Sequence, residues 1–224
     1  MQTERYSRRE FLARVYRYSS LSMMALLFGY DLSAHEQDLA KSTALLYATR
    51  YGATKDTAQW IQNGMRTHVD LLDIERVSFS DVLTRYDRFI VGSGIWTGGV
   101  HKKVIEFFET GRNSLEGKIL ATFLVCGTEE STDKGRARIE GYFNVMHASL
   151  VTKPSMSKAF GGRIIVEKLF DDDRKALTAF YNSFLHDQLR SWDHTDPEKA
   201  RCFGTDAEYN LKNPRLGSVQ KIRA

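Results

Sequence analysis

Cysteine and proline are scarce in this chain, and long apolar runs are absent. Its 224 residues include two cysteines, Cys126 and Cys202, and three prolines. Two cysteines cannot hold a small disulfide scaffold together, and no Cys-x-x-Cys pair is present for zinc or thiol redox chemistry. Because no stretch of about 18 apolar residues occurs, a polytopic membrane protein is also excluded. A disulfide between Cys126 and Cys202 stays open if the protein works in an oxidising compartment.

Charge of one sign is not in large excess either. Lys and Arg number 32 and Asp and Glu number 28, so the formal net charge is +4. No basic stripe interleaved with aromatic residues is present, and this balance does not favour a nucleic-acid-binding protein. Hydrophobic residues make up 42% and charged residues 27%, which is ordinary globular composition and excludes a wholly disordered chain.

The first 34 residues have the order of an export signal. The motif Ser7-Arg8-Arg9-Glu10-Phe11-Leu12 is followed by a short apolar stretch over residues 19–30 and by Leu32-Ser33-Ala34, a small-residue cleavage pattern. This order resembles a twin-arginine signal. It predicts export to the periplasm or to the outer face of the cytoplasmic membrane, with cleavage after Ala34 or membrane association through an uncleaved N-terminus. The alternative is an amphipathic helix with its paired arginines facing solvent.

From residue 43 onward, short apolar runs alternate with segments of helical period. Strands are predicted over residues 43–48, 69–74, 88–92 and 118–125, with a fifth shared between 150–151 and 157–160. Helices are predicted over residues 54–68, 80–85, 100–109, 133–146 and 171–189, and the last would close the domain. This alternation predicts an α/β domain over residues 43–188, with a parallel sheet covered on both faces. Residues 191–224 carry single, aperiodic apolar residues, which indicates a tail that wraps the domain or stays loose.

The exit of the first strand is the most informative segment. After the apolar run come Thr49, Arg50, Tyr51, Gly52, Ala53 and Thr54, where a helix begins. Two hydroxyls and several backbone N–H groups would meet at a helix N-terminus, which favours a phosphate group. The segment has neither the Gly-Lys-Ser/Thr end of a Walker loop nor the Gly-x-Gly-x-x-Gly of a dinucleotide site. The alternative is an ordinary strand–helix turn with a threonine cap.

The stretch from Leu45 to Ile61 is similar to the FMN-phosphate signature of flavodoxins at every defined position. This resemblance implies a flavodoxin-like three-layer sandwich with a five-stranded parallel sheet in the order 2-1-3-4-5. It also implies that FMN is bound non-covalently, with its phosphate held by residues 49–54. The resemblance extends over the alternating elements from residue 43 to residue 188.

In a flavodoxin-like fold, the exit of the third strand reaches over the ligand. That exit consists of Ser93, Gly94, Ile95, Trp96, Thr97 and Gly98. Trp96 is expected to stack on the isoalloxazine ring; the alternative is that it packs only against the protein. Many flavodoxins have glycine where Thr97 stands, and a β-branched residue resists positive φ. Two-electron chemistry is therefore favoured over stabilisation of a one-electron-reduced flavin.

The exit of the fourth strand, Cys126, Gly127 and Thr128, would supply groups near the pyrimidine end of the flavin. Cys126 either tunes or reacts with the flavin or is a small buried side chain, which is the commoner role. His101 is interpreted as a surface residue at a helix start, with proton relay as the alternative. The run 193–196, Asp-His-Thr-Asp, is interpreted as a solvated turn, because adjacent loop residues rarely converge on one metal ion.

The resemblance implies a redox protein that transfers electrons through FMN, with a redox partner protein or a membrane quinone as its partner. One alternative is a substrate-specific flavin oxidoreductase like the menaquinone-linked protoporphyrinogen oxidases, whose flavin loop is loosely similar to Ile95-Trp96-Thr97-Gly98. An NAD(P)H-dependent flavin or quinone reductase and a flavin-free interaction module are further alternatives. The near-neutral charge weakens the shuttle hypothesis, since ordinary flavodoxins are strongly acidic and dock basic partners. The intact phosphate-binding segment opposes the flavin-free module.

Overall fold

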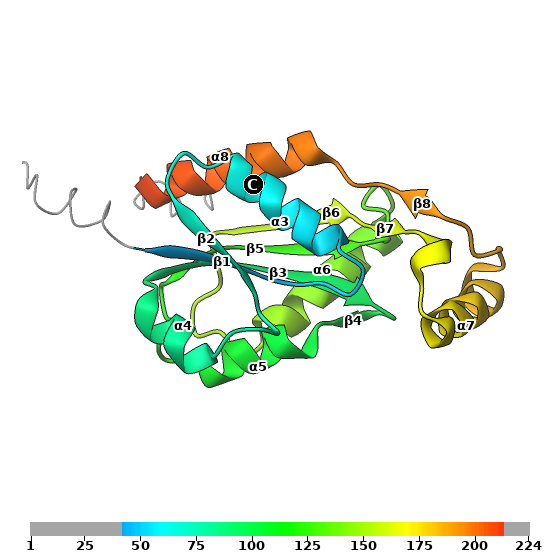
Figure 1. The fold of residues 1–224 in the computed structure, drawn as a ribbon, viewed down its shortest axis with the longest axis horizontal. Helices are drawn as coiled ribbons and strands as arrows, with labels where there is room; N and C mark the ends of the chain where they lie inside the picture. Colours follow the sequence, from blue (N-terminus) through cyan, green and yellow to red (C-terminus); the bar gives the residue numbers. More distant parts are fainter. Residues whose placement is uncertain (1–41, 213–224) are drawn as a thin grey trace, which may run out of the picture. The chain divides into compact units, whose positions relative to one another are not determined.

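The computed structural model describes residues 42–212, and a parallel sheet lies at its centre (Figure 1). Its parallel strands run in the order β2 (Val69–Asp73), β1 (Thr43–Ala48), β3 (Arg88–Trp96), β5 (Ile119–Cys126) and β6 (Met156–Gly161). A short strand, β4 (Gly99–Val100), pairs antiparallel with the end of β3. The predicted order of five parallel strands is confirmed. All six residues of β1 are buried, as expected for a strand with both faces covered.

Helices cover both faces of the sheet, which confirms the three-layer sandwich. Helices α3 (Ala53–Asn63) and α8 (Pro197–Lys212) lie on one face, and α4 (Phe79–Arg85), α5 (Lys102–Thr110) and α6 (Asp133–His147) lie on the other (Figure 1). Side chains of β1 alternate between two hydrophobic clusters. Leu45 and Tyr47 belong to the cluster under α3 and α8, and Leu46 and Ala48 belong to the cluster under the other helices. This period of two is what pleated backbone geometry requires.

Residues 163–193 form an insertion between β6 and α8. It contains β7 (Arg163–Ile164), a 3₁₀ turn over Val166–Lys168, α7 (Asp171–Phe180), a π-helical turn over Tyr181–Leu185 and β8 (Trp192–Asp193). Strands β7 and β8 pair antiparallel, and His194 N donates a hydrogen bond to Gly162 O at 2.9 Å. The chain therefore leaves the sheet and returns to it at nearly the same place. Figure 1 shows α7 beyond the end of the sheet from which β6 leads into the insertion.

The prediction of a closing helix over 171–189 is wrong in extent and in place. Helix α7 ends at Phe180, and the position against the sheet belongs to α8, in the segment predicted as an aperiodic tail. Ala200, Phe203 and Ala207 of α8 are buried against α3 and the sheet. The sequence pattern does not reveal this buried face of α8, because two of its three residues are alanines, which give a weak hydrophobic signal.

Two smaller differences concern strands. Leu150 and Val151 lie outside the fifth parallel strand, which begins at Met156, two residues after Pro154. Strand β3 continues to Trp96, four residues beyond its predicted end. Within residues 42–212, no helix is long and apolar enough to cross a membrane. The predicted export signal lies outside the described residues.

Candidate functional site

The loop between β1 and α3 has the geometry of an anion-binding site. Gly52 adopts a left-handed conformation with φ of 90°, and α3 begins at the next residue. Gly52 N donates a hydrogen bond to Thr49 Oγ1 at 3.0 Å, which folds the loop back on itself. The first N–H groups of α3 have no intrahelical acceptors, and the helix dipole adds positive potential there. Thr54, in this first turn, is 2% exposed. The loop therefore suits a phosphate group.

The second predicted segment divides between a strand and a turn. Ser93 to Trp96 belong to β3, and only Thr97 and Gly98 form the turn into β4. Ser93 is buried and its Oγ accepts a hydrogen bond from His101 N at 2.9 Å. A Cβ atom at Gly94 would lie 2.8 Å from Thr54 Oγ1, so glycine allows β3 to pass closely beside residues 49–54, called here the phosphate-binding loop for its predicted role.

The turn corrects the expectation for Thr97. Thr97 has φ of 48° and Gly98 has φ of 83°, so a β-branched residue does occupy the left-handed region here. The antiparallel pairing of Trp96 with Gly99 and of Ile95 with Val100 holds the turn in this conformation. The sequence argument for two-electron chemistry rested on Thr97 avoiding positive φ, and that premise is wrong.

Trp96 lies against the phosphate-binding loop. Its ring centroid is 5.4 Å from that of Tyr51, at an interplanar angle of 45°. The Arg50 guanidinium carbon lies 5.1 Å from the Trp96 ring centroid, in a cation–π arrangement. Ile95, its neighbour in β3, packs against the hydrophobic core. The structure thus brings together the predicted flavin-binding segments 49–54 and 93–98. Stacking of Trp96 on the flavin stays a prediction.

The third predicted segment lies at the end of β5. Cys126 is 4% exposed, and burial raises the pKa of its thiol, which makes it a poor nucleophile. Cys126 and Cys202 are both free thiols, Cys202 being exposed. Gly127 is exposed and Thr128 half-buried. A Cβ atom at Gly127 would lie 2.9 Å from Trp192 Cη2, so the insertion approaches this segment closely.

Asp173 is the residue near the phosphate-binding loop that sequence reasoning missed. Arg50 donates two hydrogen bonds of 2.7 Å, one from Nε and one from Nη2, to the two carboxylate oxygens of Asp173. Tyr51 Oη donates a further short hydrogen bond to the same carboxylate and accepts one from Phe170 N at 3.1 Å. The Arg50 guanidinium holds the pKa of Asp173 below its usual range. Sequence reasoning placed Asp173 in an acidic run at a helix start, and nothing in the sequence links it to residue 50.

Local geometry bears on two other sequence interpretations. His101 is the N-cap of α5, where its Nδ1 accepts a hydrogen bond from Lys103 N at 3.3 Å, which confirms a residue at a helix start. Asp193 accepts hydrogen bonds from the backbone N and the hydroxyl of Thr195, as in a turn. Over residues 42–212, no group of three or more His, Cys, Asp or Glu side chains could hold a metal ion.

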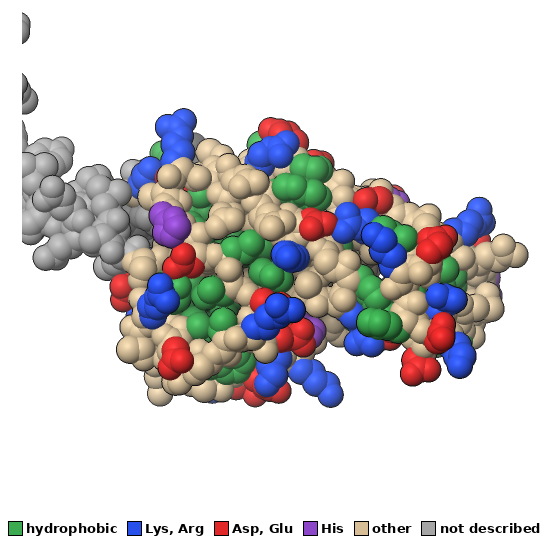
Figure 2. All heavy atoms as spheres, in the orientation of Figure 1, with side chains coloured by type: hydrophobic (Ala, Val, Ile, Leu, Met, Phe, Trp, Pro, Cys, Tyr) green, Lys and Arg blue, Asp and Glu red, His purple; other side chains and the backbone are tan. Residues whose placement is uncertain are grey.

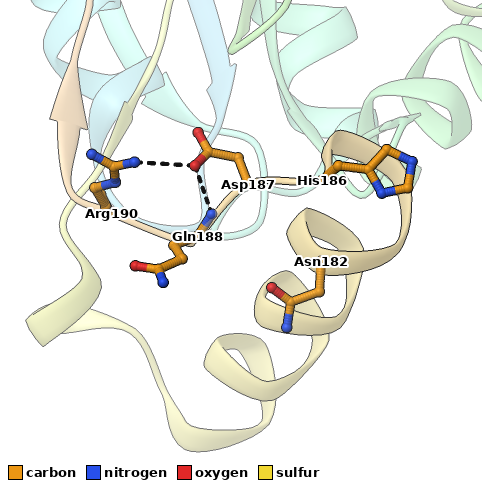
Figure 3. A pocket seen from close by; sticks show the side chains of 5 residues that line it. All are labelled: Asn182, His186, Asp187, Gln188 and Arg190. Atoms are coloured by element: carbon orange, nitrogen blue, oxygen red, sulfur yellow. Dashed lines mark hydrogen bonds and ion pairs between the residues drawn. The ribbon is translucent and has the colours of Figure 1, made fainter.

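The insertion also carries an open cavity of about 580 Å³ (Figure 3). It is lined by polar side chains from the end of the helical segment and the loop that follows: Asn182, His186, Asp187, Gln188 and Arg190. Asp187 Oδ1 accepts hydrogen bonds from Gln188 N at 2.7 Å and from Arg190 Nη2 at 3.1 Å. None of the predicted flavin-site residues lines this cavity.

Comparison with known families decides the class of the domain. The family model described as "Flavodoxin domain" matches residues 44–184, which is more than half of the chain. The chain belongs to the flavodoxin family. Its cofactor is FMN, and its function at the level of the family is FMN-dependent redox chemistry.

Comparison of this flavodoxin-family chain with curated proteins finds no match. Among solved structures, it is similar to a WrbA-like flavodoxin from Agrobacterium tumefaciens, at 15% identity and a TM-score of 0.45, covering 77% of this chain and 98% of that one. It is similar to an archaeal flavodoxin at 18% identity and a TM-score of 0.44, covering 77% and 99%. It is also similar to the Flv1 flavodiiron core of Synechocystis, at 17% identity and a TM-score of 0.46, covering 81% of this chain and 38% of that one.

The charges around the phosphate-binding loop are compatible with a dianionic phosphate. Asp173 is paired with Arg50, and Asp56 in the first turn of α3 accepts a hydrogen bond of 2.6 Å from Arg163 Nη2. Neither carboxylate therefore presents an uncompensated negative charge to the phosphate. Asp173 takes up two of the five N–H donors of the Arg50 guanidinium, and the backbone amide of Arg50 belongs to the loop that suits the phosphate.

Proposed function

We propose that this protein is an exported flavoprotein that passes electrons through FMN to or from a redox partner protein or a membrane quinone. The observation that carries the proposal is the loop from Thr49 to Thr54, with Gly52 in the left-handed conformation at the start of α3. This loop stands at the carboxyl edge of the sheet, beside the end of β3. Electrons would pass through the flavin ring, and the protein would anchor the phosphate and set the potential through its contacts with the ring.

A stepwise reductive titration, followed by visible absorption, tests this proposal. The purified protein should carry one FMN per chain, and the flavin absorbance should be lost on reduction and recovered on reoxidation. The same titration shows whether one or two electrons enter in each step. A protein that is colourless and takes up no added FMN would contradict the proposal.

Export is proposed from the twin-arginine motif together with the cofactor. FMN is made in the cytoplasm, and a non-covalent flavin must be held by a finished fold. The twin-arginine route moves folded, cofactor-loaded proteins. A protein that binds FMN non-covalently would need such a route, and the Arg8-Arg9 pair would be the signal for it. The protein would then act on the outer side of the cytoplasmic membrane, either free or held there by its N-terminus.

Replacement of both arginines by lysine tests export. The variant should accumulate as FMN-loaded protein in the cytoplasm, because the twin-arginine pathway recognises the guanidinium pair. Cell fractionation with a cytoplasmic and a periplasmic marker measures this. If the Arg8→Lys/Arg9→Lys protein still leaves the cytoplasm, or the unmodified protein never does, the export proposal is wrong.

A quinone-linked oxidoreductase is the second candidate, and the insertion is the observation that favours it. Phe170 and Phe184 are 70% and 73% exposed there, and Phe180 and Phe184 stack with centroids 5.4 Å apart. Exposed aromatic rings of this kind can contact a planar apolar acceptor. Bound FMN would supply the two electrons that, with two protons, convert a quinone to its quinol, and the exposed rings would hold the acceptor.

The second candidate predicts acceptor-specific effects. The Phe170→Ala/Phe184→Ala variant should reduce a soluble quinone more slowly than the wild type. Its reaction with ferricyanide, which needs no apolar contact, should keep the wild-type rate. Equal losses with both acceptors would indicate damage to the flavin site, and no loss with quinone would remove these rings from its binding.

A further inference from the structure

The insertion is tied to the core at the edge where FMN binds, and the ties are specific. Arg50 and Tyr51 of the phosphate-binding loop both contact Asp173 of α7. Arg163 of β7 bonds Asp56 in the first turn of α3. At the far end of the insertion, Trp192 lies against Gly127, and its Nε1 donates a hydrogen bond to Tyr181 Oη at 2.8 Å. Two of the three predicted flavin segments therefore touch the insertion.

In the contact between Asp173 and Arg50, the carboxylate is buried and the guanidinium is half exposed. The Asp173 side chain is 9% exposed, whereas that of Arg50 is 50% exposed. Asp173 is thus held in the protein while three hydrogen bonds from residues 50 and 51 converge on it. Charge-assisted bidentate pairs of this kind fix geometry as well as adding stability. Because Arg50 and Tyr51 also carry backbone amides of the phosphate-binding loop, the contact fixes the backbone that would bind the phosphate.

We propose that the insertion is a latch that slows the release of FMN, and that Asp173 is the positioning residue that fastens it to the phosphate-binding loop. The inference rests on the binding of FMN at this loop, as in the proposed function. Asp173 acts through Arg50 and Tyr51 and does not itself contact the phosphate. With the latch closed, the loop amides are held in place before FMN arrives, which lowers the entropy cost of binding.

Simple electrostatics predicts the opposite effect on FMN binding when the Asp173 carboxylate is removed. Removal of the Asp173 carboxylate leaves Arg50 as an unpaired cation close to a dianionic phosphate, and charge alone would then strengthen FMN binding. If the latch operates, loss of the ordered loop outweighs the added attraction. The sign of the change in FMN release therefore separates the two explanations.

The experiment compares Asp173→Ala with Asp172→Ala, its exposed neighbour in the same helical turn. FMN-loaded protein is diluted, and bound FMN is separated from free FMN by ultrafiltration at timed intervals. The latch predicts that Asp173→Ala releases FMN at least about tenfold faster than the wild type, while Asp172→Ala releases it at the wild-type rate. Tyr51→Phe keeps the aromatic ring and loses the hydroxyl, and it should give a smaller acceleration in the same direction.

A second measurement reports the latch without FMN. In the FMN-free protein, trypsin should cut after Arg174 and Lys175 of α7 faster in Asp173→Ala than in Asp172→Ala, because the helix is released from the core. Wild-type FMN binding with equal release rates in both variants, or slower release from Asp173→Ala, overturns the latch and leaves the proposed function intact. Absence of FMN binding by the wild type overturns both.

Discussion

At the scale of single residues, Thr54 occupies the position where the first turn of α3 meets β3. It is 2% exposed and adjoins Gly94, whose missing Cβ leaves room for the threonine hydroxyl. Its Oγ1 and the amides of the loop are the groups expected to hold the FMN phosphate. A hydrogen bond to a charged group is worth roughly 1.5–3 kcal/mol.

Thr54→Ala should therefore weaken FMN binding by at least about tenfold, as measured by fluorescence titration of the FMN-free protein. Thr54→Ser is the matched control, because it keeps the hydroxyl and loses only a methyl group; it should retain most of the affinity. Unchanged affinity in the alanine variant would remove Thr54 from the phosphate site.

Trp96 is expected to cover one face of the flavin, although Arg50 already lies 5.1 Å from its ring. The flavin would have to use the other face of the indole or displace the guanidinium. Bound FMN should have quenched fluorescence, and Trp96→Ala should restore it and shift the reduction potential, because stacking perturbs the ring. Trp60→Phe, within α3, is the control and should keep the quenching. A Trp96→Ala protein with wild-type fluorescence and potential would show that Trp96 packs only against Tyr51 and Arg50.

At the scale of elements, the carboxylate of Glu208 attaches α8 to the segment that follows α3, beside a hydrogen bond of 2.9 Å from Thr205 Oγ1 to Gly64 O. Glu208 is 5% exposed and accepts hydrogen bonds from Arg66 N, Thr67 N, Thr67 Oγ1 and Lys212 Nζ, at 2.9–3.1 Å. Burial would raise the pKa of Glu208, but these hydrogen bonds outweigh it and lower the pKa to about 2. Gly204 permits the close approach of α8, since a Cβ there would lie 2.1 Å from Ile61 O.

Glu208→Ala should destabilise the FMN-free protein by about 2 kcal/mol, because the backbone N–H groups of Arg66 and Thr67 lose a charged acceptor. Urea unfolding measures the change. Glu198→Gln, in the first turn of the same helix, is the control; it breaks an exposed pair with Arg201 and should cost less than about 1 kcal/mol. If the two variants unfold at the same urea concentration, α8 is not anchored through Glu208.

The elements that sequence reasoning recovered are those with a strong local signal. Strands β1 and β5 have nearly continuous apolar runs, and the loop over 49–54 has a spacing specific to one ligand, so the fold and this part of the site were predictable. Helix α8 was missed because its buried stripe is made of small residues. The Asp173–Arg50 contact was missed because it joins residues 123 positions apart, and no local pattern encodes such a contact.

At the scale of the whole molecule, charge is spread without a dominant patch on the face drawn in Figure 2, where basic and acidic side chains are interspersed. With a net charge of +4, long-range attraction would contribute little to the choice of a partner. Recognition would instead depend on local contacts, and the exposed ring of Phe170 lies beside the phosphate-binding loop, 5.8 Å from the Tyr51 ring between centroids. The insertion, rather than the overall charge, is therefore where we expect substitutions to change the choice of partner.

The stability of the molecule should depend on a buried histidine on the face opposite α8. His147, near the end of α6, is 8% exposed, and its Nε2 lies 2.9 Å from Thr122 Oγ1, which in turn lies 2.9 Å from Ser157 Oγ. Burial, with a smaller contribution from the charge of Lys153, lowers the pKa of His147 to about 4. The imidazole is therefore neutral in the folded protein at neutral pH.

Acid should consequently destabilise the folded protein in two windows. Between pH 6.5 and about 4 the unfolded chain binds the His147 proton and the folded protein does not, so stability falls as the pH falls, by about 3 kcal/mol in total. Between pH 4.5 and about 2 the Glu208 carboxylate adds a further loss, because its folded pKa is below its unfolded value. Urea unfolding of the FMN-free protein over this pH range measures both. His147→Gln, whose amide can still bond Thr122, should flatten the upper window and keep the lower one. Glu208→Gln should keep the upper window and reduce the lower one without abolishing it, because the pKa of Asp173 is also lowered in the folded protein. An upper window that persists in His147→Gln would place the titrating group elsewhere in the chain.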